Sequence, residues 1–337
     1  MTKIVVIGAG VVGLSAAVQL QEKYPNADIT LVADKFAKET TSNGAAGIYR
    51  PTMHHSAGND LQQMRQWSKD SWDFLHGLAR SAGAAESGNQ LVTLFNVSKD
   101  YVGPGVYSEF CLDYRELTLD QVHTWGTQFN HGYTATVVIT QCIRYLPWLM
   151  IRFKEKGGKV EKRRVDSFDE FTGKYDIVVN CTGFGSRKLL GDMKVYPVRG
   201  QILQVSAPWI KHAVYENSGD GTYIIPCTDY VVVGGCREVN NFSTDVNEKQ
   251  SEEIFEKACR FYPPLRGAKI IRSWAGLRPY REPIRVEKEI MNIGGQKLKV
   301  VHNYGHGGNG VCLSWGTSVN AVKMVDELLN QPIQSNL

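Results

Sequence analysis

The stretch Ile4-Val5-Val6-Ile7-Gly8-Ala9-Gly10-Val11-Val12-Gly13 lies almost at the start of the chain and decides the fold class. Its first four residues are apolar and β-branched, which is typical of a buried parallel strand. Residues 11–24 have the apolar spacing of a helix that stops before Pro25, and residues 29–32 form a second strand-like run. The segment therefore predicts a strand–helix–strand unit and an α/β fold class with a parallel sheet.

The glycines of this unit have the G-x-G-x-x-G spacing of a Rossmann-like, pyrophosphate-binding turn. Gly8 permits the tight turn, Gly10 lets a phosphate approach the backbone, and Gly13 lets the helix pack closely against the strand. The start of the helix offers free N–H groups and a positive dipole end to the phosphates. Asp34 follows Gly13 by 21 residues and suits the ribose hydroxyls. The unit therefore predicts a bound dinucleotide.

Three further segments of small residues favour FAD over a diffusible nicotinamide coenzyme. They are residues 40–48, residues 180–183 and the glycine-rich residues 305–310. A long cofactor that is buried along its length would contact such remote segments, whereas a diffusible coenzyme usually needs one nucleotide fold. The helix after residues 305–310 could direct its positive end at the flavin pyrimidine, where it would favour the anionic reduced form. We therefore predict non-covalent FAD.

Composition excludes several other classes of protein. The 337 residues predict about two domains, and 42% hydrophobic with 21% charged residues is typical of a globular chain. A net charge of +4 is too small to predict nucleic acid or an anionic membrane as partner, and no apolar run reaches the ~20 residues of a membrane span. The seven cysteines include no C-x-x-C pair, so we expect reduced thiols in an intracellular protein and no metal site.

The order of the remaining patterns predicts two interleaved domains. Helical patterns cover residues 60–82, 141–156, 248–260 and 315–329, and strand-like runs cover residues 160–168, 177–179 and 297–301. Short strands at residues 202–205, 223–225 and 230–233 indicate an antiparallel sheet, and residues 272–285 are expected to form a compact Arg/Pro/Gly segment. We predict an FAD-binding domain from residues 1–50, 141–199 and 286–337, and an antiparallel substrate-binding domain from residues 51–140 and 200–285.

Motifs along nearly the whole chain resemble those of the D-amino-acid oxidase family, most closely its D-aspartate oxidase branch. The resemblance lies in residues 5–15, Thr41-Ser42 with Ala45-Ala46-Gly47, residues 177–183, Pro197-Val198-Arg199-Gly200-Gln201, Tyr223-Ile224-Ile225-Pro226, Gly276-Leu277-Arg278-Pro279-Tyr280-Arg281 and His302-Asn303-Tyr304-Gly305-His306-Gly307. It implies an FAD enzyme that oxidises an amine with O₂. The Ser335-Asn336-Leu337 ending differs from the S-K-L peroxisomal address at one position, which with the resemblance predicts the peroxisomal matrix and its import receptor as partner, with the cytosol as the fallback.

The resemblance also implies roles for four residues. Arg278 matches the arginine that binds the substrate α-carboxylate through two parallel hydrogen bonds, and the Tyr223 hydroxyl adds another. Arg237 matches the arginine that serves the side-chain carboxylate, since a buried second carboxylate needs a cation. Arg50 lies where family members line the active site and could be a second such cation.

The expected activity is the oxidative deamination of acidic D-amino acids, with D-aspartate first and D-glutamate second as candidate substrates, to a 2-oxo acid, ammonia and hydrogen peroxide. The hydride would pass from Cα of the neutral amine to flavin N5, so no strong side-chain base is required. The FAD contacts expected at the motifs and beside them are Gly8, Ala9, Gly10, Val11, Val12, Gly13, Asp34, Lys35, Thr41, Ser42, Ala46, Gly47, Ile48, Val165, Cys181, Gly183, Gly200, Arg278, Gly307, Gly308, Asn309, Gly310 and Val311.

Two residues depart from the pattern of the aspartate branch. Glu216 stands where that branch has an arginine on a mobile lid, and Gly308 replaces a serine that can contact substrate. Either change could shift the preference towards D-glutamate. We expect the pair His54-His55 to lie at the surface or behind the site, because no third ligand is spaced for a metal.

Three alternatives stay open at this point. The chain could oxidise neutral or basic D-amino acids on the same fold, it could be an NAD(P)-dependent dehydrogenase, or it could be a nucleotide-binding sensor without activity. The substrate preference, the oligomeric state and the motion of any lid cannot be read from the sequence.

Overall fold

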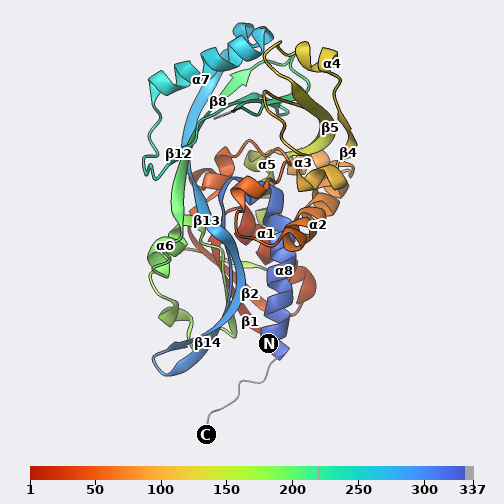
Figure 1. Ribbon diagram of the computed structural model, residues 1–337. Coiled ribbons are helices and arrows are strands. Elements are labelled where there is room, and N and C mark those ends of the chain that lie inside the picture. The colour runs from red at the N-terminus through yellow and green to blue at the C-terminus, as the bar shows by residue number, and fades with distance from the viewer. Residues whose placement is uncertain (219–220, 331–337) are drawn as a thin grey trace.

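The computed structural model describes residues 1–218 and 221–330, and these residues form one large mixed sheet with helices packed against it (Figure 1). The predicted α/β class, with a parallel and an antiparallel part, is confirmed. The Ser335-Asn336-Leu337 ending lies outside the described residues, so the expected peroxisomal address stays a prediction.

The parallel half of the sheet surrounds the glycine turn. Its strands lie in the order β6-β2-β1-β7-β14, and each neighbouring pair is parallel. Val5 on the central strand pairs with Thr30 on one side and Val178 on the other, and all three side chains are buried. The strands are β1 (Lys3–Ala9), β2 (Asp28–Phe36), β6 (Lys159–Lys162), β7 (Ile177–Asn180) and β14 (Gln296–His306).

The antiparallel half continues the same sheet in the order β13-β8-β11-β10-β9-β3-β5-β4, in which the β9–β3 pair is parallel. The short strand β12 also pairs with β8, outside this linear order. The strands are β3 (Asn89–Ser98), β4 (Leu112–Glu116), β5 (His131–Thr140), β8 (Tyr196–Ser206), β9 (Ala213–Glu216), β10 (Thr222–Pro226), β11 (Val231–Gly234), β12 (Glu238–Val239) and β13 (Lys269–Ile293).

The long strand β13 joins the two halves, and Figure 1 shows it running from one to the other. It pairs with β8 up to Tyr280 and with β14 at Tyr280 and again from Arg285 onwards, and the register with β14 shifts between Tyr280 and Arg285. The Arg/Pro/Gly segment at residues 272–285 therefore lies within this one strand. Its prolines do not end the strand, because Pro283 lies in the irregular stretch where pairing is interrupted. The domain boundaries stay a prediction.

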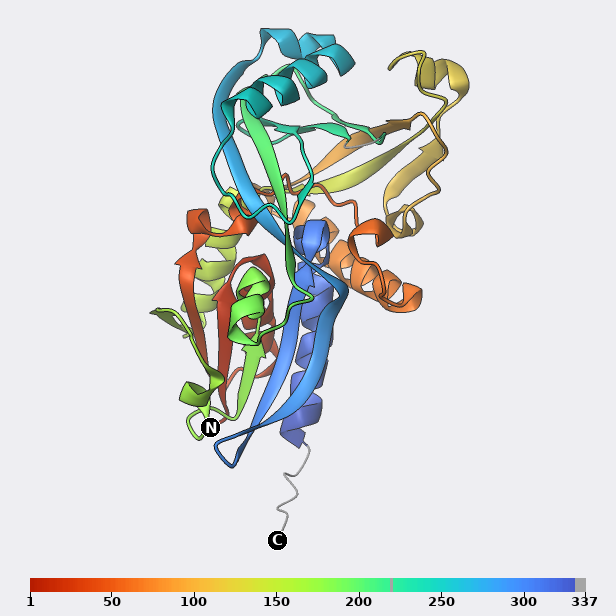
Figure 2. The ribbon, with the colours of Figure 1, turned by 60° about the vertical axis from the view of Figure 1, so that its left-hand side comes forward.

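The helices cover both halves (Figure 2). α8 packs against α1 and α2 beside the parallel half, whereas α7 packs on the antiparallel strands β8, β10 and β11. Within residues 1–218 and 221–330, no helix has both the length and the apolar character that a membrane crossing requires. The helices are α1 (Val11–Lys23), α2 (Leu61–Ala79), α3 (Ala84–Ser87), α4 (Leu119–His123), α5 (Cys142–Glu155), α6 (Ser186–Leu189), α7 (Glu248–Phe261) and α8 (Gly310–Asn330).

Local sequence explains where several elements begin and end. Asp60 caps α2 by accepting the Gln63 N–H at 2.9 Å, and Asn247 caps α7 in the same way. The strand expected at residues 160–168 is shorter than predicted, because β6 ends at Lys162. The chain then turns so that Phe168 enters the apolar cluster beneath the parallel half.

Candidate active site

A cavity of about 640 Å³ lies between the two halves of the molecule. Its lining includes Gly8 and Asp34 from the parallel half and Tyr223 and Arg237 from the antiparallel half. This volume is within the range of pockets that bury a small ligand or cofactor. One continuous cavity therefore joins the expected nucleotide site to the expected substrate site.

The glycine turn at one end of this cavity is built to leave room at the backbone. Gly8 has a φ of +107°, and a Cβ there would lie 2.4 Å from the Cys181 carbonyl oxygen. No side chain caps α1 at Gly10, and the N–H of Val11 donates to Ser42 Oγ at 3.0 Å. The turn therefore offers a close backbone approach and the positive end of a helix to a phosphate.

Most of the expected FAD contacts line the cavity, and three do not. Gly13 faces the strand, where a Cβ would lie 1.8 Å from the Gly8 carbonyl oxygen, so its role is the close packing of helix on strand. Gly200 lies behind Arg278, and the Asn309 side chain is turned towards residues 52–56. The other residues expected to contact FAD line the cavity: Gly8, Ala9, Gly10, Val11, Val12, Asp34, Lys35, Thr41, Ser42, Ala46, Gly47, Ile48, Val165, Cys181, Gly183, Arg278, Gly307, Gly308, Gly310 and Val311.

These residues fit FAD, and Asp34 provides a direct test. Replacing Asp34 with asparagine is expected to weaken FAD binding about 10-fold or more, because hydrogen bonds to a charged group contribute about 1.5–3 kcal/mol. The measurement is the FAD dissociation constant from flavin fluorescence on dilution. The exposed Asp100, changed in the same way, serves as the matched control. An unchanged dissociation constant for the Asp34 variant would remove the carboxylate from the cofactor site.

Arg278 lies in the cavity wall where β13 pairs with β8. Its Nη1 donates to the Cys236 carbonyl oxygen at 3.2 Å, and a Cβ on Gly200 would lie 2.3 Å from the guanidinium. Because Gly200 has no side chain, the Arg278 guanidinium can occupy this space. The Tyr223 hydroxyl lies within hydrogen-bonding range of Arg278, and burial raises the pKa of Tyr223 to about 12, so the hydroxyl keeps its proton.

Arg237 lies in the same cavity, just beyond the end of β11. Its Cζ is 5.5 Å from the centre of the Tyr280 ring, and the guanidinium lies within hydrogen-bonding range of the Tyr280 hydroxyl. Its Nε is buried and has no partner in the described part of the chain. This guanidinium is therefore held by an aromatic residue rather than by an acid.

Arg50 is the third guanidinium in the cavity. Its Cζ lies 4.1 Å from the centre of the Tyr215 ring, and it is within hydrogen-bonding range of the Tyr133 hydroxyl, which in turn bonds the Tyr107 hydroxyl. Its Nε is also buried and unpartnered among the described residues.

No ion pair joins Arg50, Arg237 or Arg278 to a carboxylate within residues 1–218 and 221–330, although Arg199, Arg281 and Arg285 do have such pairs. Three half-buried guanidinium charges in one cavity favour a ligand that supplies the anion, because a ligand that displaces their water without pairing them pays a desolvation cost. The cavity is therefore suited to a ligand that carries more than one negative charge.

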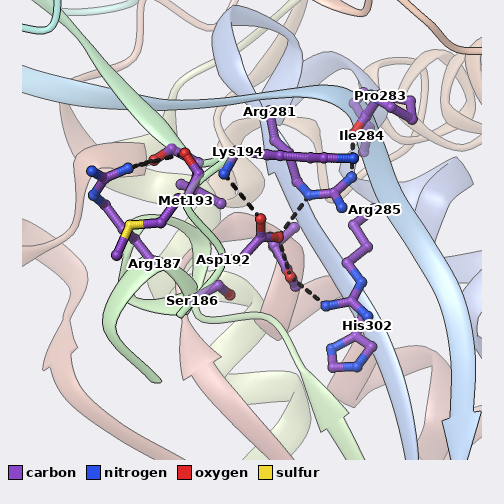
Figure 3. A network of polar contacts seen from close by, with 12 residues as sticks. Ser186, Arg187, Asp192, Met193, Lys194, Arg281, Pro283, Ile284, Arg285 and His302 are labelled. Carbon is purple, nitrogen blue, oxygen red and sulfur yellow. Dashed lines mark hydrogen bonds and ion pairs between the residues drawn. The ribbon is translucent and has the colours of Figure 1, made fainter. Parts of the chain in front are cut away.

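A polar network behind the cavity wall holds one of its aromatic residues in place (Figure 3). The Asp192 carboxylate accepts hydrogen bonds from Arg281 Nε at 2.7 Å and from the Tyr304 hydroxyl at 2.8 Å. Burial would raise the pKa of Asp192, but these bonds lower it. Arg285 donates to the same hydroxyl at 2.8 Å. Tyr304 lines the cavity, whereas Asp192, Arg281 and Arg285 do not, so these three residues act on the cavity by fixing the position of Tyr304.

Two expectations about the substrate end need correction. Glu216 is buried at the end of β9, its carboxylate lies 4.0 Å from Lys257 Nζ on α7, and it does not line the cavity. An acid there is turned towards a lysine and so does not face the ligand. His55, expected at the surface or behind the site, lines the cavity, whereas His54 is exposed.

Sequence reasoning also missed aromatic residues that shape the cavity. Trp274 lies against Gly44 and Gly276, since a Cβ on either glycine would fall within 2.3 Å of the indole. The two glycines, remote in sequence, are the only signal that a bulky ring lies between them. His306 lines the cavity too, but its Nε2 lies 3.0 Å from the buried Thr317 hydroxyl, which suits a structural role.

Comparison with known proteins also indicates an FAD site. The family model described as FAD dependent oxidoreductase matches residues 3–323. The chain is similar to the D-aspartate oxidase of Homo sapiens, with 39% identity over 99% of both chains, and to the D-amino acid oxidase of Dugesia ryukyuensis, with 33% identity over 97% and 98% of the two chains. Its fold is similar to that of glycine oxidase from Geobacillus kaustophilus, with a TM-score of 0.79, 18% identity and coverage of 97% and 95%.

Proposed function

The chain belongs to the family of FAD-dependent oxidoreductases, and from that premise we propose that it oxidises D-amino acids that carry a second acid group. The predicted family, the enzyme class and the cofactor FAD are confirmed. The alternative of an NAD(P)-dependent dehydrogenase is not favoured. The relatives named as D-aspartate and D-amino acid oxidases support the D-amino acid as the substrate class.

The observation that carries the choice of an acidic substrate is the set of three half-buried guanidinium groups in one cavity, none of which is paired with an acid in residues 1–218 and 221–330. Arg278 and the Tyr223 hydroxyl would bind the α-carboxylate, since a planar guanidinium can form two parallel hydrogen bonds with it. Arg237 and Arg50 would then receive the second carboxylate. A neutral side chain would leave both of these cations without a partner, and an unpaired buried charge disfavours binding.

Catalysis in this arrangement rests on orientation. FAD, when bound, supplies the acceptor for the Cα hydride and passes the electrons to O₂, which yields hydrogen peroxide. The arginines fix both ends of the substrate and so fix the direction of its Cα–H bond, which lowers the entropic part of the barrier. The substrate amine reacts in its neutral form, and the imino acid that leaves the site is hydrolysed to the 2-oxo acid and ammonia.

The test is a peroxide assay of the purified holoenzyme over a panel of D-amino acids. We expect D-aspartate and D-glutamate to be oxidised with a higher kcat/KM than D-alanine, D-serine and D-lysine. A higher kcat/KM for a neutral or basic D-amino acid would instead support an oxidase of neutral or basic D-amino acids. No peroxide with any D-amino acid would support a nucleotide-binding sensor without activity.

We also propose that the enzyme acts in the peroxisomal matrix, with the import receptor as a partner through Ser335-Asn336-Leu337. Production of hydrogen peroxide suits that compartment. The test is the location of a fluorescent protein fused in front of the whole chain, with the last three residues present or deleted. A cytosolic signal from the intact chain would contradict the proposal.

A further inference from the structure

The imidazole of His55 is fixed at the cavity wall by the residues around it. His55 ends the short turn Met53–His55, and the buried Asn309 side chain binds this turn on both sides. Asn309 Nδ2 donates to the Thr52 carbonyl oxygen at 2.8 Å and to Ser56 Oγ at 2.7 Å. Asn309 therefore holds His55 in position.

The hydrogen bonds of Tyr280 decide which nitrogen of His55 carries the proton. The Tyr280 hydroxyl lies 2.5 Å from His55 Nδ1, and it is also within hydrogen-bonding range of Arg237 and of the Gly308 N–H. Both groups can only donate a hydrogen bond, so the hydroxyl proton is free to be donated to Nδ1. A neutral imidazole that accepts at Nδ1 carries its hydrogen on Nε2.

The charges around His55 keep the ring neutral. Burial, the neighbouring His54 and the three arginines of the cavity lower the pKa of His55 to about 3. At neutral pH the ring is therefore a hydrogen-bond donor without charge.

Gly308 makes room for this ring. A Cβ at position 308 would lie 2.8 Å from His55 Cδ2 and 3.0 Å from Nε2, so a serine there and the present position of His55 exclude each other. The Nε2 edge of the ring thus lies over Gly308, and both residues line the cavity. The departure from serine at position 308 is coupled in space to the histidine at position 55.

We propose that His55 donates its Nε2 hydrogen to the second acid group of the substrate, beside Arg237, and thereby helps to select dicarboxylic D-amino acids. This inference rests on the proposed function. Tyr280 bonds His55 through its hydroxyl, and the Arg237 guanidinium lies over the ring of the same tyrosine, so a carboxylate held by Arg237 would lie next to the imidazole. A neutral donor adds a hydrogen bond there without adding a fourth cation to the cavity.

The first experiment separates ligand binding from catalysis. Succinate has the carbon skeleton and both carboxylates of aspartate without the amine, and propionate has one carboxylate. In His55→Ala holoenzyme we expect the dissociation constant of succinate, measured from the flavin absorbance, to rise about 10-fold, because a hydrogen bond to a charged group is lost. The constant for propionate should stay within about twofold. The conservative His55→Gln should recover most of the succinate affinity, and the exposed neighbour variant His54→Ala should match the wild type.

A second variant tests the coupling to position 308 without deleting the imidazole. Gly308→Ser is expected to weaken succinate binding to a similar degree, since the new side chain displaces the ring. In the His55→Ala background the same serine should add little, so the two effects should not be additive.

The outcomes distinguish a failure of the proposed substrate preference from a failure of the role of His55. A wild-type enzyme that binds propionate as tightly as succinate refutes the proposed preference for a second acid group. A wild-type enzyme that prefers succinate, together with a His55→Ala variant that keeps the full preference, refutes only the role of His55. Additive effects of the two substitutions would show that position 308 acts independently of the ring.

Discussion

Replacing Arg278 with methionine is expected to lower kcat/KM for D-aspartate about 10³-fold. The variant keeps much of the side-chain volume but removes both hydrogen bonds to the α-carboxylate. Removing one partner of a buried charge pair costs about 3–5 kcal/mol, because the remaining charge is left without a counter-ion. Since every amino acid has an α-carboxylate, the loss should be of similar size for D-alanine. The measurement is peroxide formation at several concentrations of each substrate.

The conservative change Arg278→Lys keeps the charge and is expected to recover only part of the activity, because an ammonium group cannot form two parallel hydrogen bonds. The flavin absorbance of each variant shows whether FAD is still bound, which separates a lost substrate contact from a lost cofactor. An Arg278→Met holoenzyme that keeps more than about a tenth of the wild-type kcat/KM would contradict the assignment of the α-carboxylate to this residue.

The nucleotide end of the molecule could be predicted from the sequence because the contacts that shape it join residues close together in the chain. Gly8 and Gly13 lie within one strand–turn–helix unit, where backbone space alone fixes the spacing. Gly200 and Asn309, which we expected to contact FAD, do not line the cavity, because their neighbours come from elsewhere in the chain. Gly200 is a glycine on account of Arg278, which reaches it from the paired strand β13.

The substrate end depends on contacts between remote segments, and these have weak sequence signals. The family resemblance identified Arg278, Tyr223 and Arg237, but it gave no reason for the histidine at position 55. The reason lies in residues of β13 and of the glycine-rich loop, namely Tyr280 and Gly308. The surroundings of Glu216 have the same origin, because its partner Lys257 lies 41 residues further along the chain, on α7.

Substitution of Arg237 should lower the activity towards D-aspartate much more than the activity towards D-alanine. In Arg237→Ala we expect kcat/KM for D-aspartate to fall about 10²-fold and kcat/KM for D-alanine to stay within about threefold of the wild type. The cost to aspartate lies near 3 kcal/mol, at the lower end of the range for a buried charge pair, because Arg50 and His55 still face the second carboxylate. D-alanine has no group that contacts this cation, so it loses nothing.

Arg50 is the matched comparison, since it has the same charge, the same cavity and the same unpartnered Nε. Arg237 lies over the ring of Tyr280, two residues beyond Arg278 on β13, whereas Arg50 lies over the ring of Tyr215, which stacks on Tyr223. If Arg237 is the main partner of the aspartate side chain, Arg50→Met should lower kcat/KM for D-aspartate less than Arg237→Ala does. Equal losses of D-aspartate and D-alanine in Arg237→Ala would mean that this arginine supports the fold of the site and does not recognise the second carboxylate.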